Sequence, residues 1–148
     1  MDLTATYPRS VSEKLAGVVM LARTTDKAKA KAHGNLGEYH YDCPMDKAVF
    51  GFLGIDQAQY LEAVAHARSD ADIENYAKQF VQKKTAAEID TFNANFLQYK
   101  PEAGSEAETD FHELRKSVAP DRDDVTTWAD VLDLDEKRVV PRRTAAAV

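Results

Sequence analysis

Helix start signals recur along this chain and strongly limit what it can fold into. In such a signal, a Ser, Thr or Asp side chain caps the first turn of a helix, and a Glu or Gln three residues later caps it in return. The signals are Ser10/Glu13, Asp56/Gln59, Thr85/Glu88 and Ser105/Glu108, with a weaker Ser69/Asp72 pair and a Thr126/Thr127 cap. Gly34, Gly54 and Gly104 can take the left-handed conformation that ends a helix. These signals predict a series of short helices.

Apolar residues between the signals recur at the three- and four-residue spacing of a helix face. The first such segment carries Val11, Leu15, Val18 and Ala22. Polar and aromatic residues alternate only around Tyr39 and Tyr41, as in an extended chain. We therefore expect an all-α fold, a compact single-domain bundle of about seven short helices, with one short extended segment near residues 37–42.

The length of 148 residues is that of one ordinary domain. We expect a single helical domain over residues 1–140 and a flexible C-terminal tail over 141–148, because chain ends without apolar periodicity fray. The lone Cys43 cannot form an internal disulfide, and no secretory signal is present. The apolar stretch 15–22 is too short to cross a bilayer, which takes about 20 residues. We expect a cytoplasmic protein with no membrane partner.

The charge balance argues against nucleic acid as a partner. The chain has 25 acidic and 19 basic residues, a net charge of −6, which repels a polyphosphate backbone. A local basic run around Lys27, Lys29 and Lys31 could neutralise only a few phosphates. We therefore expect no nucleic-acid partner.

The stretch between residues 21 and 56 mixes ionisable and aromatic residues with apolar ones, as binding sites do. Arg23, Asp26 and Lys27 fall on one side of the first predicted helix. They could form an anion clamp in which Arg23 supplies a planar fork, Lys27 a point charge, and Asp26 orients the arginine. The alternative is an exposed ion pair that stabilises the helix by only about 0.2–0.5 kcal/mol.

The segment 37–46 supplies candidates for catalysis. Pro44 suits the first position of a helix, which makes Cys43 the N-cap, where the helix dipole favours a thiolate. Tyr39 and Tyr41 could donate a proton, and Asp46 could act as a general base if it is desolvated. Each also has a structural explanation: a buried cysteine, core tyrosines, and a carboxylate that complements the positive helix start.

No metal and no cofactor are expected. The histidines and acids of the 33–46 region lack the i, i+3 or i, i+4 spacing that places two ligands on one helix face. The glycines form neither a phosphate loop nor a dinucleotide fingerprint, and no Gly-x-Ser-x-Gly elbow is present.

Four motifs occur in order along the first part of the chain: Tyr7-Pro8-Arg9-Ser10, residues 21–28 (LARTTDKA), residues 37–46 (GEYHYDCPMD) and residues 52–56 (FLGID). Together they resemble a known bacterial family, catalogued as domain of unknown function 5069. The resemblance covers roughly the first hundred residues. Lys29 departs from the pattern, which would have arginine there. The resemblance implies a helical domain in a bacterial cytoplasm and carries no activity with it.

Two functional hypotheses follow. In the first, the protein binds a small anionic molecule in a pocket between the first helix and the 37–46 segment, where Arg9, Arg23 and Lys27 hold the anion. Tyr39, Tyr41, Cys43 or Asp46 would add acid–base or nucleophilic chemistry, and whether the protein is an enzyme stays open. In the second, the same polar residues are structural, and the chain is a non-catalytic homo-oligomeric or protein-interaction module.

Overall fold

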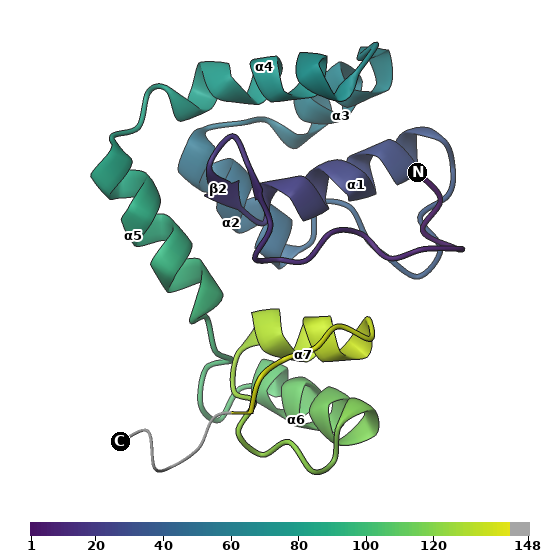
Figure 1. Cartoon of the computed structure of the whole chain (residues 1–148), viewed down its shortest axis with the longest axis vertical. Coiled ribbons are helices and arrows are strands. Elements are labelled where there is room, and N and C mark those ends of the chain that lie inside the picture. The colour runs from purple at the N-terminus through teal and green to yellow at the C-terminus, as the bar shows by residue number, and fades with distance from the viewer. Residues whose placement is uncertain (143–148) are drawn as a thin grey trace. The chain divides into compact units, whose positions relative to one another are not determined.

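The computed structural model describes residues 1–142, which are mostly α-helical, and the prediction of a helical fold is confirmed (Figure 1). The elements of this range are β1 (Lys14–Leu15), β2 (Val18–Val19), α1 (Leu21–Ala32), α2 (Pro44–Leu53), α3 (Gln57–His66), α4 (Asp70–Val81), α5 (Ala86–Leu97), α6 (Glu106–Val118) and α7 (Trp128–Asp135). None of these helices has both the length and the apolar character needed to cross a bilayer.

The chain divides into two compact units, residues 1–93 and residues 94–148. The single domain over 1–140 stays a prediction. Most of the expected tail, residues 143–148, lies outside the described residues. Its first two residues are tied down: the Pro141 carbonyl accepts a hydrogen bond from Arg122, and Arg142 pairs with Asp121.

Most of the predicted helix starts are correct. Asp56 accepts a hydrogen bond from the Gln59 amide, and Thr127 accepts one from the Asp130 amide. At α5 the cap is reciprocal, because Thr85 and Glu88 each accept a hydrogen bond from the other's amide. Pro44 is the first residue of α2 and Cys43 is its N-cap, as expected. These caps are local interactions, which explains why the sequence predicts them.

The predicted first helix start at Ser10 is wrong. Residues 14–19 form a two-residue-turn hairpin instead, and α1 begins only at Leu21. Ala16 and Gly17 both have positive φ, as a type I′ hairpin turn requires. The apolar residues of this segment are therefore brought into the core by the hairpin rather than by a helix.

The extended segment expected near 37–42 does not form a strand. Residues 37–38 and 41–42 are turns, and Gly37 and Asp42 both have positive φ. A Cβ atom at Gly37 would lie 3.2 Å from the Leu3 carbonyl oxygen, so the chain passes too close there for a larger residue without rearrangement. The alternation around Tyr39 and Tyr41 reflects a folded loop.

Helix α1 is the centre of the first unit. Residues 21–28 are all buried, although five of them are polar or charged. The helix packs chiefly against α3, and also against the hairpin and α2. An α-helix buried on every side needs a partner for each of its polar side chains.

The second unit has its own apolar centre. Phe111 of α6 and Val131 of α7 are buried with Val125 of the connecting loop, and Trp128 meets the Phe111 ring edge to face. Arg122 links this loop to the chain beyond α7, donating to the Val140 carbonyl oxygen over 2.9 Å.

The hairpin is held from outside by Asn93 of α5. The Asn93 side-chain amide accepts a hydrogen bond from the Val19 amide and donates one to the Gly17 carbonyl.

We expect Asn93→Ala to lower the free energy of unfolding by about 1–2 kcal/mol, because two backbone groups lose their partner. Urea denaturation measures this loss. Asn95→Ala, on an exposed position of the same helix, should change stability by less than about 0.5 kcal/mol; equal losses in both variants would contradict the pinning role.

Candidate functional site

Arg9 and Asp26 form a bidentate ion pair between the N-terminal segment and α1. The Arg9 Nε and Nη2 atoms donate to the two Asp26 oxygens at 3.1 Å each, and the Arg9 amide donates to Oδ2 at 2.8 Å. The Asp26 side chain is 2% exposed and that of Arg9 is 38% exposed. Burial alone would lower the pKa of Arg9, but the hydrogen bonds and the charge of Asp26 outweigh it, and the net pKa is raised. Asp26 therefore holds a charged, partly solvent-facing guanidinium in a fixed orientation.

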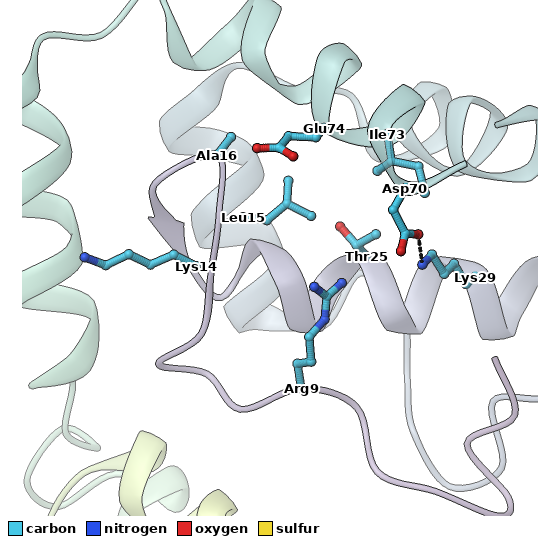
Figure 2. A pocket seen from close by; sticks show the side chains of 9 residues that line it. All are labelled: Arg9, Lys14, Leu15, Ala16, Thr25, Lys29, Asp70, Ile73 and Glu74. Atoms are coloured by element: carbon cyan, nitrogen blue, oxygen red, sulfur yellow. Dashed lines mark hydrogen bonds and ion pairs between the residues drawn. The ribbon is translucent and has the colours of Figure 1, made fainter. Parts of the chain in front are cut away.

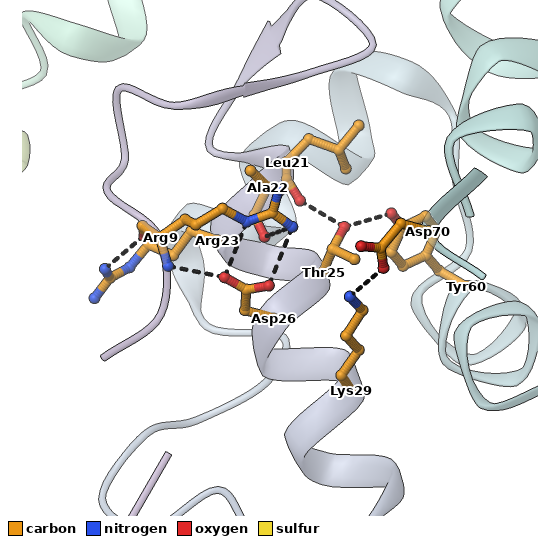
Figure 3. A network of polar contacts seen from close by, with 9 residues as sticks. All are labelled: Arg9, Leu21, Ala22, Arg23, Thr25, Asp26, Lys29, Tyr60 and Asp70. Carbon is orange, nitrogen blue, oxygen red and sulfur yellow. Dashed lines mark hydrogen bonds and ion pairs between the residues drawn. The ribbon is translucent and has the colours of Figure 1, made fainter. Parts of the chain in front are cut away.

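Arg23 reinforces this contact from the same helix. It is buried, and its Nη1 atom donates to the Arg9 carbonyl oxygen over 3.2 Å. Its guanidinium also lies over the Tyr39 ring, 5.7 Å from the ring centre. Figure 3 shows Arg9, Arg23 and Asp26 together at the side of α1 that faces the N-terminal segment. Arg23 thus helps to position the segment that carries Arg9.

Lys27 and Asp46 form a second ion pair, between α1 and α2. The Lys27 Nζ atom lies 2.7 Å from Asp46 Oδ2, and both side chains are buried, at 5% and 0% exposure. Asp46 also accepts hydrogen bonds from the Thr24 hydroxyl and the Cys43 amide. Lys27 further donates to the Cys43 sulfur over 3.3 Å. The alternative of an exposed surface pair is wrong for Asp26 and Lys27, because the carboxylates of the Arg9–Asp26 and Lys27–Asp46 pairs are both buried.

The two tyrosines of the 37–46 segment have different surroundings. Tyr41 is buried, and its hydroxyl donates to the Gln57 carbonyl at the start of α3. Burial raises the pKa of Tyr41, so this phenol is a poor proton donor at neutral pH. Tyr39 is half-buried beneath the Arg23 guanidinium. These contacts join the loop to α1 and α3.

A third polar contact of α1 leads to α3. The Thr25 and Tyr60 hydroxyls lie 2.6 Å apart, and Thr25 donates to the Leu21 carbonyl oxygen. Tyr60 is fully buried, and burial is the main cause that raises its pKa to about 12. The Thr25 hydroxyl donates to the Leu21 carbonyl oxygen, so in the pair with Tyr60 it accepts the hydrogen bond and the Tyr60 hydroxyl donates it.

Thr25 and Arg9 also border a cavity of about 150 Å³. Its walls come from the N-terminal segment, the hairpin, α1 and α4 (Figure 2), and the lining residues are Arg9, Lys14, Leu15, Ala16, Thr25, Lys29, Asp70, Ile73 and Glu74. In Figure 2 the Arg9 guanidinium is aimed toward Thr25 and Leu15, whereas Lys14 points away. The cavity is thus a small space with apolar and charged walls.

Lys29 and Asp70 form an ion pair at the mouth of the cavity. The Lys29 Nζ atom lies 2.6 Å from Asp70 Oδ1, and the Asp70 side chain is 88% exposed. The hydrogen bond from Lys29 lowers the pKa of Asp70. The Lys29 ammonium has three N–H groups and this pair uses one, so two remain to bind a ligand.

A sequence profile of one family matches residues 5–138, most of the chain; its description is "domain of unknown function (DUF5069)". The chain belongs to this family. The match confirms the resemblance carried by the four motifs and extends beyond the first hundred residues. No protein with a curated description matches the chain. Membership in the DUF5069 family supplies no activity, so function has to be argued from the geometry.

In this DUF5069 chain the predicted site residues fall into two groups. Arg9, Arg23, Asp26 and Tyr39 lie together on one side of α1, and Lys27, Tyr41, Cys43 and Asp46 lie toward α2 and its preceding loop. Of the eight, only Arg9 lines the cavity described above. The spacing predicts an anion clamp in which Arg23 and Lys27 hold one anion and Asp26 orients Arg23. In the structure Asp26 pairs with Arg9, and Lys27 pairs with Asp46.

Five charged or polar residues of the cavity were not predicted from the sequence, namely Lys14, Thr25, Lys29, Asp70 and Glu74. Thr25 and Lys29 are four residues apart, a spacing that puts them on one face of a helix. That signal was present but looked like part of a solvated basic run. Nothing local links Lys29 to Asp70, which lies 41 positions further along the chain.

Proposed function

We propose that the protein binds a small molecule through an anionic group, in the cavity between the N-terminal segment, the hairpin, α1 and α4. The observation that carries the proposal is the Arg9 guanidinium, which Asp26 orients on one edge and which borders the cavity with its remaining surface. Its Nη1 atom makes no hydrogen bond to any described residue, so it can donate to a ligand oxygen. An arginine held in this way loses little conformational freedom when it binds a carboxylate or phosphate.

The size of the cavity supports a small ligand. A volume of about 150 Å³ is well below the roughly 300–1,000 Å³ of sites for drug-sized molecules. Lys29 supplies a second cation and Thr25 a hydroxyl at the same cavity. This is a different place from the pocket expected beside residues 37–46. Catalysis is not part of the proposal, because Tyr39, Tyr41, Cys43 and Asp46 lie outside the lining.

A cytoplasmic location remains a proposal, supported by the lone cysteine.

A second proposal concerns the Lys27–Asp46 group: its role is structural. The burial of both side chains and the hydrogen bonds from Thr24 and Cys43 to Asp46 favour this role. The two proposals are compatible, because they concern different contacts of α1. The homo-oligomer stays a prediction.

Binding can be tested by following backbone amide NMR signals while propionate or inorganic phosphate is added at low ionic strength. We expect the signals of Arg9, Thr25 and Lys29 to shift with saturation. Lys29→Met should weaken binding about tenfold, since it removes one of two cations near the anion. Its fold should be unaffected, because the lost pair with the exposed Asp70 is worth less than about 1 kcal/mol.

Lys116→Met is the matched control. Lys116 is exposed on α6 and does not line the cavity, yet its replacement changes the net charge by the same amount. Binding that weakens equally in both variants, or shifts spread without saturation over the whole surface, would argue against the site.

A further inference from the structure

The charges around the cavity are nearly balanced, which bears on the kind of molecule that fits. Figure 2 shows Arg9 and Lys29 on two sides, Asp70 beside Lys29, and Glu74 reaching in from α4 near Leu15 and Ala16. Asp26 already balances the charge of Arg9 from behind. A molecule that is only anionic would be attracted by the two cations and repelled by the two carboxylates.

We propose that the ligand is a small α-amino carboxylate, which carries an ammonium group next to its carboxylate. This inference rests on the proposed function and adds the substrate class. The carboxylate binds Arg9 and the free N–H groups of Lys29, and the ammonium donates to Glu74. The apolar surface of Leu15 and Ile73 takes a short side chain. Each charged group of the ligand then lies beside a side chain of the opposite charge.

Glu74 is available for this role. Among the described residues, Glu74 pairs with Lys78, one turn further along α4, with Nζ 3.7 Å from Oε1 and both side chains about half exposed. An ion pair this long and exposed contributes little to stability, so breaking it to let Glu74 bind a ligand costs little free energy. Glu74 can therefore turn to an ammonium group without a large energetic cost.

The small volume favours a short side chain. About 150 Å³ is at most half of the roughly 300–1,000 Å³ of a site for a drug-sized molecule. Glycine and alanine have the shortest side chains, whereas an aromatic side chain is much larger. Leu15, Ala16 and Ile73 offer no polar group to a longer polar side chain. We therefore expect preference for L-alanine over L-phenylalanine.

The test compares two probes that differ by the ammonium group alone, L-alanine and propionate, in the same NMR titration. With the unmodified chain, L-alanine should bind at least tenfold more tightly than propionate. Glu74→Gln should weaken L-alanine binding about tenfold and leave propionate binding unchanged or stronger. Glu113→Gln, an exposed position on α6, is the control and should change neither.

The possible failures are distinguishable. Propionate binding as tightly as L-alanine would overturn the amino-acid inference and leave the anionic site in place. Signals at Arg9, Thr25 and Lys29 that respond to neither probe would overturn both proposals. If Glu74→Gln and Glu113→Gln weakened L-alanine binding equally, the role of Glu74 would be overturned, because a general effect of the net charge would then explain the weaker binding.

Discussion

Replacing Lys27 with methionine is expected to lower the free energy of unfolding by about 3–5 kcal/mol. Lys27 is the only cation within ion-pair distance of Asp46 among the described residues, and the carboxylate has no exposed surface. Methionine fills most of the lysine volume and is a good helix former, so neither a large cavity nor helix propensity accounts for the loss. The cost arises because a buried carboxylate is left without its counter-charge.

Chemical denaturation monitored by circular dichroism measures this effect. The matched control is Lys31→Met, on an exposed position of the same helix, which should cost less than about 1 kcal/mol. Adding Asp46→Asn to Lys27→Met should recover part of the loss, because the remaining buried group is then neutral and can still accept hydrogen bonds. A Lys27→Met variant as stable as the unmodified chain would refute the structural role of this pair.

Replacing Asp26 with asparagine is expected to lower the free energy of unfolding by about 2–3 kcal/mol, the second large effect. The amide keeps the size of the carboxylate but loses its charge, and only one of its two ends can accept. Three hydrogen bonds from Arg9 reach the carboxylate, so at least one is lost, because the Arg9 N–H groups cannot accept from an amide NH2. The loss should be smaller than at Lys27, because the Arg9 side chain is partly exposed and water can solvate it.

Asp70→Asn is a matched control for Asp26→Asn, since both carboxylates pair with a cation that lines the cavity. At pH 7 Asp70→Asn should lower the free energy of unfolding by less than about 0.5 kcal/mol, because Asp70 is exposed.

The contribution of the Lys29–Asp70 pair depends on pH. Lys29 lowers the pKa of Asp70 in the folded chain, so this contribution to stability is present above the ordinary carboxyl pKa. It is lost as the pH falls through the lowered pKa, and the small difference from the unmodified chain should vanish there. Equal losses from the two replacements would mean that burial does not decide the energetics.

Most of the helical framework could be predicted because its signals are local. The caps at Asp56, Thr85 and Thr127 involve residues three apart, and the N-cap position of Cys43 follows from Pro44. The exception is the start of α1. Its apolar spacing fits a helix from Val11 onward, but the positive φ at Ala16 and Gly17 turns the chain into a hairpin. Apolar spacing over so short a segment does not separate the two structures.

The candidate site was predicted only in part. The sequence drew attention to Arg9, Arg23, Asp26 and Lys27 as an anion-binding group. Arg9, Asp26 and Lys27 form close ion pairs with protein partners. The sequence did not indicate that Asp26 and Lys27, adjacent in the chain, would have different partners. That division depends on which elements pack on each side of α1.

The helical class and the positions of most helix starts follow from the sequence alone, because capping and periodicity act within a few residues. The burial of residues 21–28 of α1 follows only from tertiary packing, and with it the pairing of Arg23, Asp26 and Lys27 inside the protein rather than their solvation. Tertiary packing also decided where the cavity lies, since Arg9, Lys29 and Glu74 come together from three separate segments. Contacts between distant segments depend on the packing of the whole unit, which no local pattern encodes.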